Sequence, residues 1–63
     1  MKYPPRTQAW IDQLGARAEA TTTLEELRAL MQGTVDLLRA ERAGDQARSE
    51  QLLDWLEAGE WKA

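Results

Sequence analysis

The longest helical pattern in the sequence covers residues 23–43, and it constrains the fold more than any other feature. Its start fits a capping box, in which the side chains of Thr23 and Glu26 satisfy each other's backbone donors. Thr22 with Glu25 would serve as well, so the start is defined to within one residue. Two glutamates in the first turn also complement the helix dipole. The sequence therefore predicts that a long helix begins here.

The apolar residues of this helix, expected over about residues 24–43, spread over about 160° of its circumference. They form two seams. The first seam is interpreted as core and consists of Leu24, Leu27, Met31, Val35 and Leu38. The second seam is Leu30 and Leu37, seven residues apart. A middle helix that touches two neighbours would bury both seams. Otherwise the second seam is exposed and pairs with a second copy or with a different protein.

A shorter helix is expected before this one, over about residues 7–20. Its large apolar residues Trp10, Ile11 and Leu14 share one face at helical spacing. Gly15 weakens the helix, since glycine costs about 1 kcal/mol relative to alanine, but it allows a neighbouring helix to approach closely. Because the apolar stripe is narrow, this helix is expected to cover one side of a bundle.

A third helix is expected over about residues 46–58, after a tight junction. Gly44 is typical of the left-handed residue that closes a helix, and Asp45 directly after it is a suitable N-cap. Gly59 has the same closing role before a short tail at 59–63. A junction this short predicts antiparallel neighbours. The alternative is that Gly44 only kinks one long helix.

The sequence thus predicts one all-α domain over residues 1–63, a small three-helix bundle with up-down-up topology. Dimerisation through the middle helix is left open. A chain of 63 residues is near the lower limit for a self-supporting core, and it has no cysteine to form a disulfide. Packing or oligomerisation must therefore supply the stability.

The chain lacks the side chains that most active sites use. There is no histidine or cysteine, so no imidazole can activate a hydroxyl and a zinc site of the usual ligands is not expected. The two lysines, Lys2 and Lys62, lie at the chain ends, and no glycine-rich phosphate loop is present. The sequence predicts no enzymatic activity, no cofactor and no metal.

The net charge of −3 is unevenly distributed. Residues 1–48 carry equal numbers of basic and acidic side chains, and the whole acidic excess lies in residues 49–63. Because that end would repel a polyanion, direct binding of nucleic acid is not expected. The apolar runs are too short to span a membrane. The N-terminal residues have no apolar signal core, which favours a cytoplasmic location.

Two features of the acidic end are candidates for partner binding. Glu50, Asp54 and Glu57 form one stripe on the third helix, either as a solvated face or as a contact for a basic partner. Trp61 lies beyond Gly59, where it either folds back on the start of the middle helix or stays exposed as an interaction anchor.

These observations favour a small non-enzymatic module that regulates or inhibits a larger protein by occupying its surface, such as an inhibitor of phage or plasmid type, an antitoxin or an adaptor. The alternative is an obligate homo-oligomer with a structural role, and a homodimer is one expected partner state. The composition is typical of a bacterial or phage protein. The candidate partner-binding residues are Leu30, Leu37, Glu50, Asp54, Glu57 and Trp61.

Overall fold

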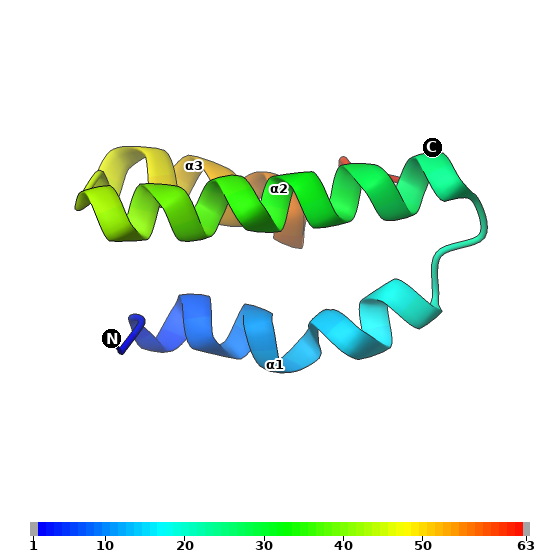
Figure 1. Cartoon of the computed structure of the whole chain (residues 1–63), viewed down its shortest axis with the longest axis horizontal. Coiled ribbons are helices and arrows are strands. Elements are labelled where there is room, and N and C mark those ends of the chain that lie inside the picture. Colours follow the sequence, from blue (N-terminus) through cyan, green and yellow to red (C-terminus); the bar gives the residue numbers. More distant parts are fainter. Residues whose placement is uncertain (1, 63) are drawn as a thin grey trace.

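Three helices make up the bundle, and consecutive helices run in opposite directions (Figure 1). A computed structural model describes residues 2–62. In it, α1 is Pro5–Glu19, α2 is Leu24–Ala43 and α3 is Gln46–Glu57, with no strand among the residues described. The predicted all-α, up-down-up bundle is confirmed.

The helix starts follow local chemistry. Pro5 occupies the first turn of α1, two residues earlier than expected, because proline has no N–H to satisfy and its φ already suits a helix. Thr23 is the N-cap of α2, and its Oγ1 accepts a hydrogen bond from the backbone N of Glu26 at 3.1 Å. The Glu26 carboxylate does not accept a hydrogen bond from the backbone N–H of Thr23, as a full capping box would require. It accepts instead from the hydroxyl of Thr22 at 3.1 Å.

The ends of α2 and α3 are followed by glycines in the left-handed region. Gly44 has φ 72° and Gly59 has φ 75°, values that other residues rarely adopt. The N–H after Gly44, that of Asp45, donates to the carbonyl of Ala40 at 3.0 Å and completes the closing turn. Asp45 then caps α3 by accepting from the backbone N of Arg48 at 3.1 Å. α2 and α3 are therefore separate helices, and the alternative of one kinked helix is wrong.

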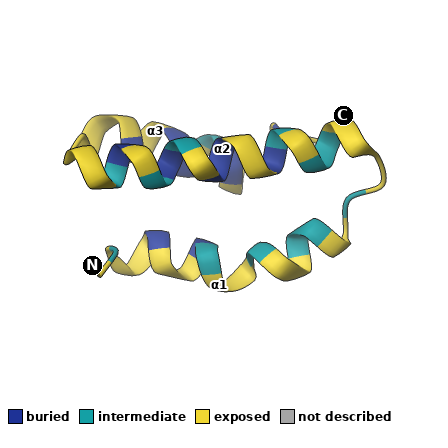
Figure 2. Cartoon of the chain, in the orientation of Figure 1, coloured by how far each residue is buried: buried dark blue, intermediate teal, exposed yellow. Residues whose placement is uncertain are grey.

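All three helices contribute to the buried core (Figure 2). Its apolar members are Trp10, Leu30, Leu37, Ala40, Leu52, Leu53, Leu56 and Trp61. On α2 the core is the second seam, since Leu30 and Leu37 are both 0% exposed. The first seam was interpreted as core, and that interpretation is wrong for most of its length. Leu24 is 69% exposed, Met31 42% and Val35 39%, while Leu27 and Leu38 are half-buried.

Small residues explain which seam of α2 is buried. Gly33, Thr34 and Ala40 are themselves buried and lie on the same side of the helix as Leu30 and Leu37. A side chain added at Gly33 would place its Cβ 2.6 Å from Cζ3 of Trp55, so α3 packs directly on the backbone of α2 there. The expected close approach at Gly15 is absent, because no atom lies within 4 Å of a Cβ built at that position.

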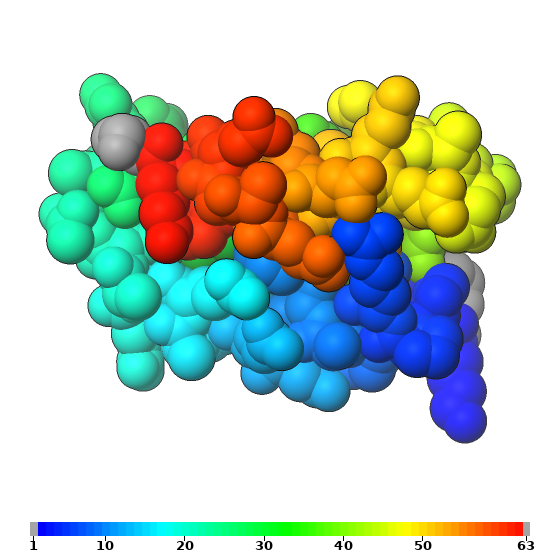
Figure 3. Space-filling model, turned by 180° about the vertical axis from the view of Figure 1, so that it is seen from behind, coloured from blue at the N-terminus to red at the C-terminus, as the bar shows by residue number. Residues whose placement is uncertain are grey.

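α1 is attached through specific side chains. Trp10 is buried, and its Nε1 donates to Oγ1 of Thr34 on α2 at 3.0 Å. The Thr34 hydroxyl in turn donates to the carbonyl of Leu30 at 2.9 Å, so the buried indole has a fully bonded acceptor. On the solvent side, the guanidinium of Arg17 covers the Trp10 ring at 4.6 Å from its centroid. Figure 3 shows α1, blue to cyan, lying along α3, yellow to orange.

Candidate functional site

Three of the candidate residues from the sequence are part of the core. Leu30 and Leu37 have no exposed surface, so the hypothesis of an exposed second seam is wrong for this fold. Trp61 is 5% exposed, and its Nε1 donates to the carbonyl of Leu56 at 2.8 Å. Beyond the left-handed turn at Gly59 the chain continues past the end of α3, and residues 60–62 lie beside the start of α2 (Figures 1 and 3). Of the two interpretations of Trp61, the folded-back one holds and the exposed anchor does not.

The acidic stripe on α3 is largely used within the chain. Arg6 donates from Nη2 to Oδ1 of Asp54 at 2.6 Å, and from Nη2 and Nε to the two oxygens of Glu57 at 2.9 and 3.2 Å. The hydrogen bonds to Glu57, and then those to Asp54, hold the pKa of Arg6 above its usual range. This cluster ties the first turn of α1 to the last turns of α3. Glu50 is exposed, and it is the member of the stripe that lies outside this cluster.

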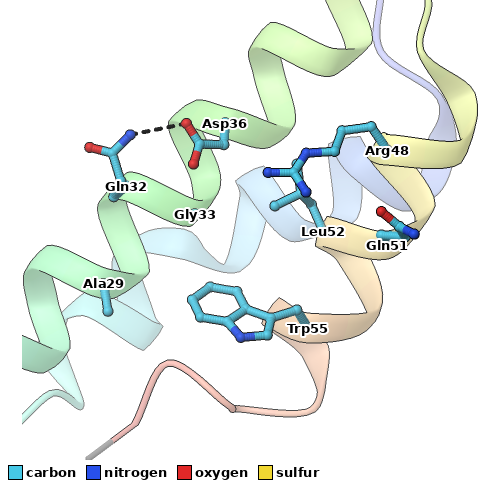
Figure 4. Close-up of a pocket in the computed structure, with 8 residues that line it drawn as sticks. All are labelled: Ala29, Gln32, Gly33, Asp36, Arg48, Gln51, Leu52 and Trp55. Atoms are coloured by element: carbon cyan, nitrogen blue, oxygen red, sulfur yellow. Dashed lines mark hydrogen bonds between the residues drawn. The ribbon is translucent and has the colours of Figure 1, made fainter.

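A groove runs between α2 and α3 on the side away from α1 (Figure 4). Its volume is about 480 Å³. At the floor of the groove α2 presents the small residues Ala29 and Gly33 where α3 presents the indole of Trp55. Its lining residues are Ala29, Gln32, Gly33, Asp36, Arg48, Gln51, Leu52 and Trp55.

The chemistry of the groove is an apolar floor with a polar rim. Trp55 is half-buried, its ring edge rests against Gly33, and its indole lines the groove (Figure 4). On the α2 rim, Nε2 of Gln32 donates to Oδ1 of Asp36 at 3.0 Å. Arg48 and Gln51 form the α3 rim. An arrangement of this kind can hold an apolar side chain and hydrogen-bond the backbone that carries it.

A shallow apolar surface adjoins the groove. It is lined by Met31 and Val35 with Arg28, and it shares Ala29 and Gln32 with the groove itself. We call the exposed residues Leu24, Met31 and Val35 the outer face of α2. Apolar surface therefore continues from the indole of α3 across to the outer side of the middle helix.

Trp55 is not among the binding residues predicted from the sequence, and neither Ala29 nor Gly33 was singled out. The signal was present in the sequence, because these two small residues are four positions apart and so share one side of a helix. What the spacing could not show is that a tryptophan on another helix would lie opposite them.

The described residues show few other chemical features. Within residues 2–62 no three acidic side chains come together as a cluster able to hold a metal ion. None of the helices described is both long and apolar enough to cross a bilayer. The chain matches no protein-family model, and comparisons with curated proteins and with solved structures gave no match either.

Proposed function

We propose that this chain is a non-enzymatic protein-binding module that regulates or inhibits a larger protein by occupying part of its surface, and that the groove between α2 and α3 is the contact. The half-buried indole of Trp55 is the observation that carries this proposal. A half-buried tryptophan that lines a preformed hollow is typical of a binding hot spot. Its position against Gly33 holds the ring in place before a partner arrives, which lowers the entropic cost of binding.

The rim of the groove indicates the kind of segment that would fit. Arg48 takes part in neither of the ion pairs formed within residues 2–62, both of which involve Arg6. An acidic residue beside the inserted side chain would therefore find a free guanidinium. We propose that the partner presents one turn of helix with an apolar anchor and a neighbouring carboxylate. A basic partner, expected from the acidic stripe, is supported only by Glu50, because Arg6 already engages the other two carboxylates.

Selection of displayed helical peptides on the immobilised protein tests this proposal without knowledge of the natural partner. We expect enriched peptides to share an apolar anchor next to an acidic residue. Their binding should be lost with Ala29→Glu, which puts a charge in the groove, and weakened with Arg48→Glu at its exposed rim. Ala47→Glu is the matched control, because it adds the same charge on α3 at an exposed position outside the groove.

Two results would contradict the proposal that the groove is the contact surface. One is a selection in which no peptide is enriched over an empty surface. The other is a set of peptides that bind the two groove variants as well as they bind the control. Circular dichroism of each variant establishes that its helices are intact, so that loss of binding is not loss of fold.

A further inference from the structure

The outer face of α2 is part of a longer row of apolar residues whose spacing is the same from either end of the row. The members of this row are Leu24, Leu27, Met31, Val35 and Leu38, with successive spacings of three, four, four and three residues. Three of them are more than a third exposed and the other two are half-buried. Spacings of three and four residues keep side chains on one side of a helix, as in the apolar seams through which helices pair. Here Leu24, Met31 and Val35 of the seam are exposed to solvent, and none of its five residues belongs to the buried core.

A row of polar residues flanks this seam with the same spacing. Its members are Glu25, Arg28, Gln32, Asp36 and Arg39. The charges of the row are opposite on the two sides of Gln32: Glu25 and Arg39 are each seven residues from it, and Arg28 and Asp36 are each four residues from it. Two copies of the row that run in opposite directions therefore place unlike charges side by side. In the single chain these charges are unused, since both ion pairs among residues 2–62 belong to Arg6.

We propose that two copies of this chain associate through an antiparallel pairing of α2 with α2 of the second copy, about a two-fold axis at Met31 and Gln32. In this register Leu24 of one copy lies against Leu38 of the other, and Val35 lies against Leu27. The same axis brings Glu25 next to Arg39 of the second copy. It also brings Arg28 of each copy next to Asp36 of the other. A pair of identical surfaces related in this way closes as a dimer and does not continue into a filament.

The polar row also selects the direction of the pairing. In a parallel pair the two-fold axis runs along the helices and places the two polar rows on opposite sides of the apolar seam, so the rows do not meet. Only the antiparallel arrangement pairs every charge of the row with its opposite. The second copy is therefore favoured over an unrelated partner, because the complementary surface is supplied by α2 itself. The α3 wall of the groove, with Trp55 and Arg48, stays free in this arrangement.

Sedimentation equilibrium from micromolar to millimolar protein tests the pairing. We expect a reversible dimer of the wild-type chain, and a monomer with undiminished helical circular dichroism for Met31→Glu, because that position is exposed in the single chain and lies on the axis. Ala47→Glu, with the same added charge on α3, should dimerise like the wild type. A wild-type chain that stays monomeric at millimolar concentration overturns the proposal, as does a Met31→Glu variant that still dimerises.

A charge exchange tests the register. Glu25→Arg or Arg39→Glu alone should raise the dimer dissociation constant about tenfold or more, because each places two like-charged pairs across the axis. The double variant Glu25→Arg with Arg39→Glu should restore the wild-type dissociation constant. A double variant as weak as the singles overturns the antiparallel register. At protein concentrations where the wild type is also monomeric, peptide binding in the groove should be unaffected by Met31→Glu, because Met31 does not line the groove. The dimer and the binding function can therefore fail separately.

Discussion

At the scale of single residues, Gly33 decides how closely two helices approach. It is buried, and it is the position at which the backbone of α2 meets the side chains of α3. Gly15 has the same residue type in the interior of a helix but lies in open space. The two glycines thus separate the packing role of glycine from its cost to helix stability.

Replacement of each glycine by alanine should have opposite effects. At Gly33 the new Cβ would lie 2.6 Å from Cζ3 of Trp55 and 3.0 Å from Cδ2 of Leu56. Overpacking of this kind costs about 1–3 kcal/mol, which exceeds the gain of about 1 kcal/mol from helix propensity. Gly33→Ala should therefore lower the free energy of unfolding in urea. Gly15→Ala, which meets no neighbour, should raise it by up to about 1 kcal/mol. Equal effects of the two changes would contradict this assignment of the contact.

At the scale of elements, α1 is joined to the other two helices by polar contacts at two points. Arg6 binds two carboxylates of α3 near the start of α1, and Trp10 is hydrogen-bonded to Thr34 of α2 within the core. The first contact is exposed and so is screened by solvent and salt. The second is buried, and a buried donor that loses its acceptor is expensive. The stability of the α1–α2 pair should therefore depend more on Thr34.

The variant Thr34→Val tests this contact with almost no change of side-chain shape. It removes the acceptor of the indole N–H and leaves that donor unsatisfied in the core, which costs about 1–3 kcal/mol. Thermal and urea unfolding should show a free energy of unfolding lowered by this amount. Because Trp10→Phe removes the donor, Thr34→Val should cost much less in a Trp10→Phe background. Additive effects of the two changes would show that the hydrogen bond does not couple the helices.

At the scale of the whole molecule, one side of α2 is the core and the other is surface. A chain of this length gains about 3–5 kcal/mol from its core, so one buried charge is enough to unfold it. Leu37→Glu should therefore abolish the helical circular dichroism, because Leu37 is 0% exposed. Val35→Glu, two residues away but on the outer face of α2, should leave a folded monomer in dilute solution. The reverse outcome would place the first seam in the core.

Much of the secondary structure could be predicted from local sequence. Residues that cap and close helices act on backbone groups within about one turn. For that reason Thr23, Gly44, Asp45 and Gly59 have the predicted roles. The start of α1 was expected at about residue 7 and lies two residues earlier, at Pro5, which suits a first helical turn.

The candidate site was predicted less well. Leu30, Leu37 and Trp61 were proposed as binding residues and are core, while Trp55, which packs against the core and also lines a groove, was not proposed. An apolar pattern identifies which residues avoid water, but it does not identify the surface that covers them. Asp54 and Glu57 were correctly placed on one side of a helix, yet their partner Arg6 lies 48 and 51 residues away in the chain.

The sequence by itself determined that the chain forms three helices, where α2 begins and ends, and that it has no histidine or cysteine for catalysis or metal binding. Those properties depend on residue types and on neighbours within a few positions. Only the tertiary structure decided which seam of α2 is buried, because that choice depends on contact between segments far apart in the chain. Size complementarity made the choice: Gly33 admits the indole of Trp55, so α3 packs on that side and the longer apolar row of α2 is left outside the buried core.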